Sequence, residues 1–170
     1  MDNRKNIVYK KNLDRGLLET DNSYFIPLNT DVDRDPMQWL IAAIKVTADN
    51  LGILHRHVIG KDFFNAHIVL EGYYKQMYEI LDDVVEAVIS LGGRELSMYE
   101  ACKLCPSLKV QDFTREEAFS LVIKMFRMLI NGFEKAREYI PGDVYSKFEE
   151  YIYWMRKECN YKLAEYFKEK

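Results

Sequence analysis

The stretch from Phe63 to Leu91 carries an apolar residue at every third or fourth position, which is the spacing of one long α-helix. Residues able to bind a transition metal recur along the same stretch at helical spacing. At 100° per residue they occupy about a quarter of the helix circumference; they are His67, Glu71, Asp82 and Glu86. Tyr74 and Tyr78 project from the same sector, and we call these six residues the donor face. A solvated face would usually mix in lysines, so we expect the donor face to lie at a wet, partly buried interface.

The length of the donor face constrains how a metal could use it. His67 and Asp82 are fifteen residues apart, which is about 22 Å along a helix at 1.5 Å per residue. A metal centre with bonds of about 2 Å cannot use both ends at once. Either the two clusters are unrelated, or an antiparallel second copy brings Asp82 and Glu86 over His67 and Glu71, where His55 joins across the intervening turn. Two-fold pairing then predicts two identical sites in each dimer, each shared between chains.

These five residues, followed by a Leu-Gly-Gly helix stop, closely resemble the Dps family of mini-ferritins. The motif is H-x11-H-x3-E-x10-D-x3-E, and Gly60, Phe63 and Phe64 between the histidines belong to the same match. The resemblance covers about residues 37 to 155 and fades at both ends. The family usually places Trp directly after the first histidine, where this chain has Arg56.

The resemblance implies an all-α, ferritin-like four-helix bundle with a short helix in the crossover between the second and third helices. It implies a ferroxidase site between subunits, with His55, His67 and Glu71 from one chain and Asp82 and Glu86 from its neighbour. It also implies the family's reaction, in which Fe(II) is oxidised, commonly by hydrogen peroxide, and ferric oxide is stored inside a hollow dodecamer. The donor residues themselves suit Fe(II), with Zn(II), Mn(II) or Co(II) as competitors.

The same residues allow other interpretations. The chain could be a DNA-binding and DNA-condensing relative that acts through a basic N-terminal arm, with weak or no ferroxidase activity. The donor residues could also be coincidental in a metal-free bundle, or the chain could be a relative that binds metal without oxidising iron. An ordinary ferritin centre inside one bundle is excluded, because it needs Glu-x-x-His pairs and the chain has none. His57 points to a different side of its helix from His55, so we expect it to be a surface residue, or one that contacts the metal ligands, and not a ligand itself.

Helix signals divide the chain into four long helices and one short one, with no strands. Four residues are predicted to cap helices: Asp35 (before Pro36), Asp62, Thr114 and Asp143. The expected helices run over residues 36–59, 63–91, 97–104 and 114–140, and from 143 almost to the C-terminus. Glu138 and Asp143 flank the last turn, where the family's shell builds an acidic iron pore.

Composition limits the remaining function classes. At 170 residues the chain fits one domain, which we divide into an N-terminal arm and extended strap (1–35) and the bundle (36–170). The net charge of −3 argues against a nucleic-acid-binding body and suits a shell that attracts cations. Neither a secretory segment nor an eighteen-residue apolar run is visible, so we expect a soluble, cytoplasmic protein with no membrane partner.

Two smaller features leave alternatives. The arm carries Arg4, Lys5, Lys10 and Lys11, which would bind DNA weakly and in a salt-dependent way, or would act only as a solubilising tail. The three cysteines include a C-x-x-C pair, Cys102 and Cys105. We interpret that pair as small apolar residues of a short helix, with a regulatory or structural disulfide as the alternative.

Overall fold

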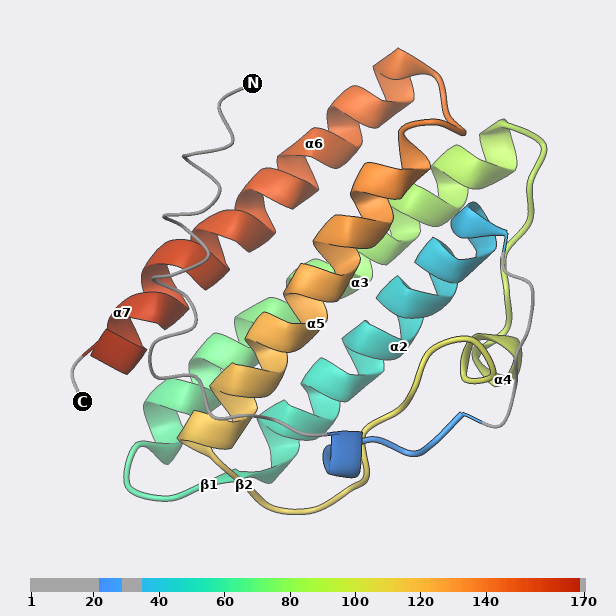
Figure 1. The fold of residues 1–170 in the computed structure, drawn as a ribbon. Helices are drawn as coiled ribbons and strands as arrows, with labels where there is room; N and C mark the ends of the chain where they lie inside the picture. The colour runs from blue at the N-terminus through green and yellow to red at the C-terminus, as the bar shows by residue number, and fades with distance from the viewer. Residues whose placement is uncertain (1–21, 29–34, 169–170) are drawn as a thin grey trace.

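Four long helical segments lie side by side, and a long crossover joins the second segment to the third (Figure 1). The structure is a computed structural model and describes residues 22–28 and 35–168. The segments are α2 (Pro36–His57), α3 (Phe63–Ser90), α5 (Arg115–Ala136) and a fourth that joins α6 (Gly142–Lys157), the π-helix η2 (Glu158–Lys162) and α7 (Leu163–Lys168). The short helix α4 (Met98–Ala101) lies in the crossover from α3 to α5, and η1 (Asn22–Tyr24) precedes the bundle. This confirms the predicted all-α, ferritin-like four-helix bundle.

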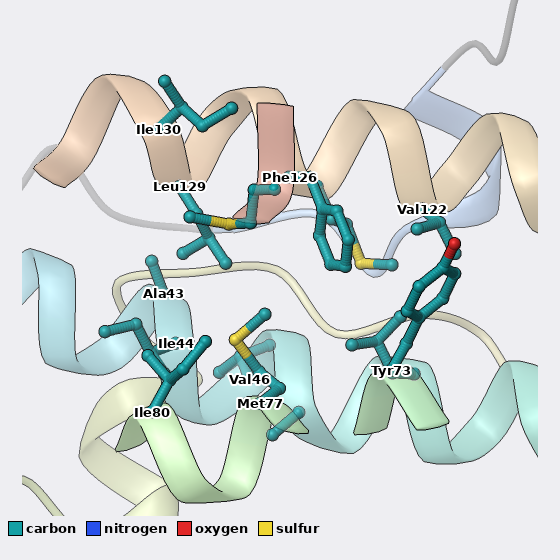
Figure 2. Close-up of a cluster of buried hydrophobic side chains, with 14 of the residues drawn as sticks. Ala43, Ile44, Val46, Tyr73, Met77, Ile80, Val122, Phe126, Leu129 and Ile130 are labelled. Atoms are coloured by element: carbon teal, nitrogen blue, oxygen red, sulfur yellow. The ribbon is translucent and has the colours of Figure 1, made fainter. Parts of the chain in front are cut away.

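The core forms where the apolar stripes of the helices meet. Figure 2 shows side chains of α2, α3 and α5 that point toward one another, among them Ile44, Met77 and Phe126. All three are fully buried, with at most 2 % of their surface exposed. The 3.6-residue period read from the sequence therefore marks the faces that pack.

Two of the four predicted caps are confirmed and two are wrong. The Asp35 carboxylate accepts a hydrogen bond from the Met37 amide at 3.0 Å, and Thr114 forms a capping box with Glu117. Asp62 stands before α3 but makes no capping bond, because its carboxylate is paired with the guanidinium of Arg115. The fourth segment begins one residue earlier than expected, after Pro141, so Asp143 lies inside the first turn and caps nothing.

The prediction of no strands is also wrong, although the strands are very short. Strand β1 (Val58–Ile59) pairs in parallel with β2 (Phe113–Thr114), with Val58 opposite Phe113. Both of these side chains are buried, so the first helix ends at His57, where the chain becomes extended to fill the end of the bundle. This pair fixes the end of α2 beside the start of α5.

The described part of the predicted strap follows the crossover. Residues 22–28 bond to it through the Ile26 amide, which donates to the Ser107 carbonyl at 2.8 Å, and through the Lys109 amide, which donates to the Tyr24 carbonyl at 2.9 Å. The basic residues Arg4, Lys5, Lys10 and Lys11 lie outside the described residues. Cys102, Cys105 and Cys159 form no disulfide with one another in the described part of the chain. In the described ranges, no helix is both long and apolar enough to cross a membrane.

Candidate metal centre

The two histidines of the motif are brought into contact by the turn between α2 and α3. His55 lies in the last turn of α2 and His67 in the second turn of α3. Gly60, with φ of +110°, reverses the chain between them in a conformation that side-chain-bearing residues rarely adopt. The two imidazole rings stack with centroids 3.8 Å apart and planes 29° from parallel.

A reciprocal pair of hydrogen bonds fixes the orientation of both rings. His55 Nδ1 lies 3.0 Å from the carbonyl oxygen of His67, and His67 Nδ1 lies 2.8 Å from the carbonyl oxygen of His55. A carbonyl oxygen can only accept, so each Nδ1 carries the proton and donates it. In the neutral form of each ring, this leaves the lone pair on Nε2, and neutral imidazole is the form in which histidine binds a metal. The fold therefore presents two imidazole donors side by side.

Glu71 adds a charged carboxylate one turn beyond His67. It is paired with the ammonium group of Lys75. The hydrogen bond and charge of Lys75, with smaller contributions from His55 and His67, lower the pKa of the Glu71 carboxyl. The lysine contradicts our expectation that this face would hold none, and its i,i+4 spacing from Glu71 was a readable signal.

The other two motif residues are not brought to this cluster. Asp82 and Glu86 lie further along α3, are exposed, and form no ion pair or side-chain hydrogen bond with any residue that the structure describes. Within residues 22–28 and 35–168, no three His, Cys, Asp or Glu side chains are grouped so as to hold a metal ion. One chain thus brings His55 and His67 into contact, with Glu71 one helical turn beyond them, and leaves Asp82 and Glu86 at the other end of the donor face.

No protein-family model matches the sequence, and a search of curated proteins finds no match either. Solved structures do match. A Dps protein from Vibrio cholerae O1, described as one of the ferritin-like diiron-carboxylate proteins, superposes with a TM-score of 0.69 at 21% identity, over 77% of this chain and 86% of that one. Dps from Staphylococcus aureus gives 0.63 at 20% identity, over 79% and 91%. Antigen TpF1 from Treponema pallidum gives 0.62 at 21% identity, over 79% and 99%.

The chain has the Dps fold. At these identities the likeness establishes the architecture, so the resemblance read from the motif is confirmed at that level.

Aromatic rings surround the histidine pair in this Dps-like bundle. Tyr74 approaches His55 with ring centroids 5.1 Å apart, and Phe63 approaches His67 at 4.9 Å. Arg56, which stands where the family usually has Trp, is exposed and folds back along α2. A Cβ added to Gly52 would lie 3.0 Å from its Nη1 atom.

The remaining sequence candidates lie away from the histidine pair. His57 Nδ1 is 3.9 Å from the Asp112 carboxylate, which belongs to the crossover. Glu138 and Asp143 are both exposed at the turn between α5 and α6, so an acidic pore at that turn of the Dps fold stays a prediction.

Proposed function

We propose that this protein is a mini-ferritin that oxidises Fe(II) at sites shared between two copies of the chain and stores the ferric product in a hollow shell. The observation that carries the proposal is the His55–His67 pair. Its reciprocal hydrogen bonds leave two Nε2 atoms free to bind a metal, beside the charged carboxylate of Glu71.

The second half of each site comes from the partner chain. Asp82 and Glu86 share the donor face with His67 but lie too far along α3 to reach it, and they have no partner among the described residues. An antiparallel second copy places the partner's Asp82 and the partner's Glu86 over His67 and Glu71. The exposed Asp82 and Glu86 thus become ligands of a metal site that is complete only when two chains assemble.

The mixed donor set suits both oxidation states of the substrate. Imidazole retains Fe(II), and carboxylates stabilise the Fe(III) that forms. With hydrogen peroxide as oxidant, two Fe(II), one peroxide and two protons give two Fe(III) and two water molecules. Dioxygen is the alternative oxidant, and Zn(II), Mn(II) or Co(II) would compete for the same ligands.

Assembly into two-fold dimers, and of those dimers into a dodecamer in the cytoplasm, is part of the same proposal. Apolar side chains that are exposed in the single chain, such as Phe64 (78 % exposed) and Ile68 (64 % exposed), lie on the same helix as the donor face. Their burial against a second copy would stabilise the dimer. Metal bound across the interface would then stabilise the assembly further.

The test is stopped-flow measurement of ferric absorbance after Fe(II) and peroxide are mixed anaerobically with the purified protein. Wild type is expected to oxidise iron rapidly into a soluble product. The double variant Asp82→Asn, Glu86→Gln is expected to oxidise it at the rate of buffer, while sedimentation shows that it still assembles.

A matched control removes two other exposed carboxylates. Asp112→Asn, Glu149→Gln makes the same chemical change at positions 70% and 55% exposed, both outside the donor face, and should oxidise iron as wild type does. Equal, slow oxidation in all three proteins would show that the chain is not a ferroxidase.

DNA binding by the N-terminal arm stays a prediction from the sequence. Its test is a gel shift at low and physiological salt, with and without residues 1–11. Binding that is lost with those residues and weakened by salt would establish it.

A further inference from the structure

Two tyrosines of the donor face continue the line of rings that begins at the metal centre. His67 stacks on His55, and the Tyr74 ring lies 5.1 Å from the His55 ring. Tyr78 follows one turn later, edge-on to Tyr74 with centroids 6.4 Å apart. Tyr78 is 46% exposed, and neither phenol forms a hydrogen bond with the described residues. The line therefore leads from the histidines to the surface of α3.

The proposed antiparallel pairing of two α3 helices determines which residues of the partner lie against Tyr74 and Tyr78. If Asp82 faces the partner's Glu71 and Glu86 faces the partner's His67, both pairs have their midpoint between residues 76 and 77. The two-fold axis crosses α3 there. Tyr74 and Tyr78 stand on either side of that point, so Tyr74 lies within one residue of the position opposite the partner's Tyr78. Four phenol rings then meet on the axis, midway between two sites about 22 Å apart.

We propose that Tyr74 and Tyr78 form, with their copies, a redox relay that connects the two iron sites of a dimer. This inference rests on the proposed function, since it uses the same two-fold pairing. The relay allows two Fe(II) ions held at different sites to share the two oxidising equivalents of one peroxide molecule.

The steps balance when only one Fe(II) is present at the site that peroxide reaches. That Fe(II) reduces peroxide to hydroxide and a hydroxyl radical and becomes Fe(III). The radical takes the hydrogen atom of a phenol, so water and a tyrosyl radical form. An electron from the Fe(II) of the other site, with a proton from solvent, restores the phenol and gives the second Fe(III). The relay thus consumes the radical that a single iron would release.

The neighbouring tyrosine Tyr73 shows why position matters. It points into the core, is 6% exposed, and its hydroxyl donates to the buried Glu158 carboxylate at 2.9 Å. Tyr73 therefore cannot join the rings of the donor face. Tyr153 of α6 is 68% exposed and lies on a different helix, which makes it a suitable control.

The geometry is tested without any metal. The full-length protein is photo-oxidised with tris(bipyridyl)ruthenium(II) and persulfate, and the covalent dimer is isolated on a denaturing gel. Mass spectrometry is expected to find dityrosine joining Tyr74 to the partner's Tyr78. That product should be lost in Tyr74→Phe and in Tyr78→Phe, and kept in Tyr153→Phe.

The chemistry is tested by freeze-quench electron paramagnetic resonance after one Fe(II) per dimer is mixed with peroxide. Wild type and Tyr153→Phe should give a tyrosyl signal and little spin-trapped hydroxyl radical. The double variant Tyr74→Phe, Tyr78→Phe should lose the signal and release more trapped radical.

The outcomes of these experiments distinguish the tyrosine relay from the two-fold pairing on which it rests. Crosslinking without a tyrosyl signal, or a signal that the double variant keeps, would overturn the relay and leave the shared site intact. An assembled protein that never joins Tyr74 to Tyr78 would overturn the pairing on which the relay depends. The Asp82→Asn, Glu86→Gln experiment separately decides whether the chain is a ferroxidase.

Discussion

The donor face and the attachment of the fourth segment use polar side chains in opposite ways. Along the fourth segment, three tyrosine hydroxyls donate to carboxylates across helix boundaries, and we call these pairs the tyrosine seam: Tyr73–Glu158, Tyr151–Asp83 and Tyr166–Glu116. On the donor face, Tyr74, Tyr78, Asp82 and Glu86 have no such partners among the described residues. Similar residue types therefore stabilise the fold in one region and remain available for binding in the other.

The difference shows how to separate structural from functional polar residues in one chain. A buried carboxylate such as Glu158, 2% exposed, is costly unless both oxygens are bonded, and here Tyr73 bonds one and Lys162, at 2.8 Å, the other. An exposed, unpaired acid on an ordered helix carries no such cost. Where several exposed, unpaired acidic residues share one sector of a helix, we infer that they bind a partner from outside the chain.

The largest expected effect is on activity. In His67→Gln, the rate of Fe(II) oxidation in stopped flow should fall about 100-fold or more, because the change removes a proposed metal ligand. The free energy of unfolding without metal should fall by only about 1 kcal/mol, the value of one hydrogen bond. If the variant instead lost activity because it unfolds, His67 would have a structural role like that of the tyrosine seam.

The seam should show the reverse pattern. Glu158→Ala leaves the buried Tyr73 hydroxyl without its acceptor, which should lower the free energy of unfolding in urea by about 1–3 kcal/mol. The oxidation rate per folded molecule should not change. Glu158→Gln, which keeps an acceptor, should lose less; equal losses would show that the hydrogen bond does not matter.

Alkaline pH should weaken the seam. Burial, together with the Glu158 carboxylate, raises the pKa of Tyr73, and burial with the hydrogen bond to Asp83 raises the pKa of Tyr151. Because a tyrosine of the unfolded chain loses its proton near pH 10 while the folded one keeps it, this stabilisation is complete below about pH 10 and is lost as pH rises further. Denaturant titrations across that range should show a shallower fall in Tyr151→Phe than in wild type.

The smallest effect concerns a hydroxyl that follows neither pattern. Ser120 is buried, and its Oγ has no hydrogen-bond partner among the described residues. Ser120→Ala should therefore change the free energy of unfolding by less than about 1 kcal/mol, in the stabilising direction. Clear destabilisation in thermal melts would reveal a partner for this hydroxyl.

The sequence predicts most of the fold because the deciding signals are local. Helical periodicity, Asp35–Pro36, the Thr114–Glu117 box and Gly92 each act within one or two turns, and helices α2 and α3 end within two residues of expectation. The β1–β2 pair and the Asp62–Arg115 ion pair join residues more than fifty positions apart. No local pattern carries that information.

The site divides in the same way. The spacing of His55, His67 and Glu71 predicts which residues gather, and the structure does bring the two histidines together. The sequence does not predict that each imidazole donates a hydrogen bond to the backbone carbonyl of the other histidine, because these bonds depend on how α2 and α3 approach each other. The contribution of Asp82 and Glu86 stays a prediction, because it depends on a second chain.

The π-helix η2 has a consequence for how the chain tolerates changes of length. In an unbroken α-helix, the stripe of Phe148, Ile152, Met155 and Cys159 would continue through Lys162 and Tyr166. The buried residues are instead Leu163 and Phe167, each one position later. Residues 158–162 therefore behave as an α-helix into which one amino acid has been inserted. Deleting the exposed Asn160 would leave Leu163 and Phe167 on the buried stripe, whereas deleting a residue within α6 would turn every later side chain out of register.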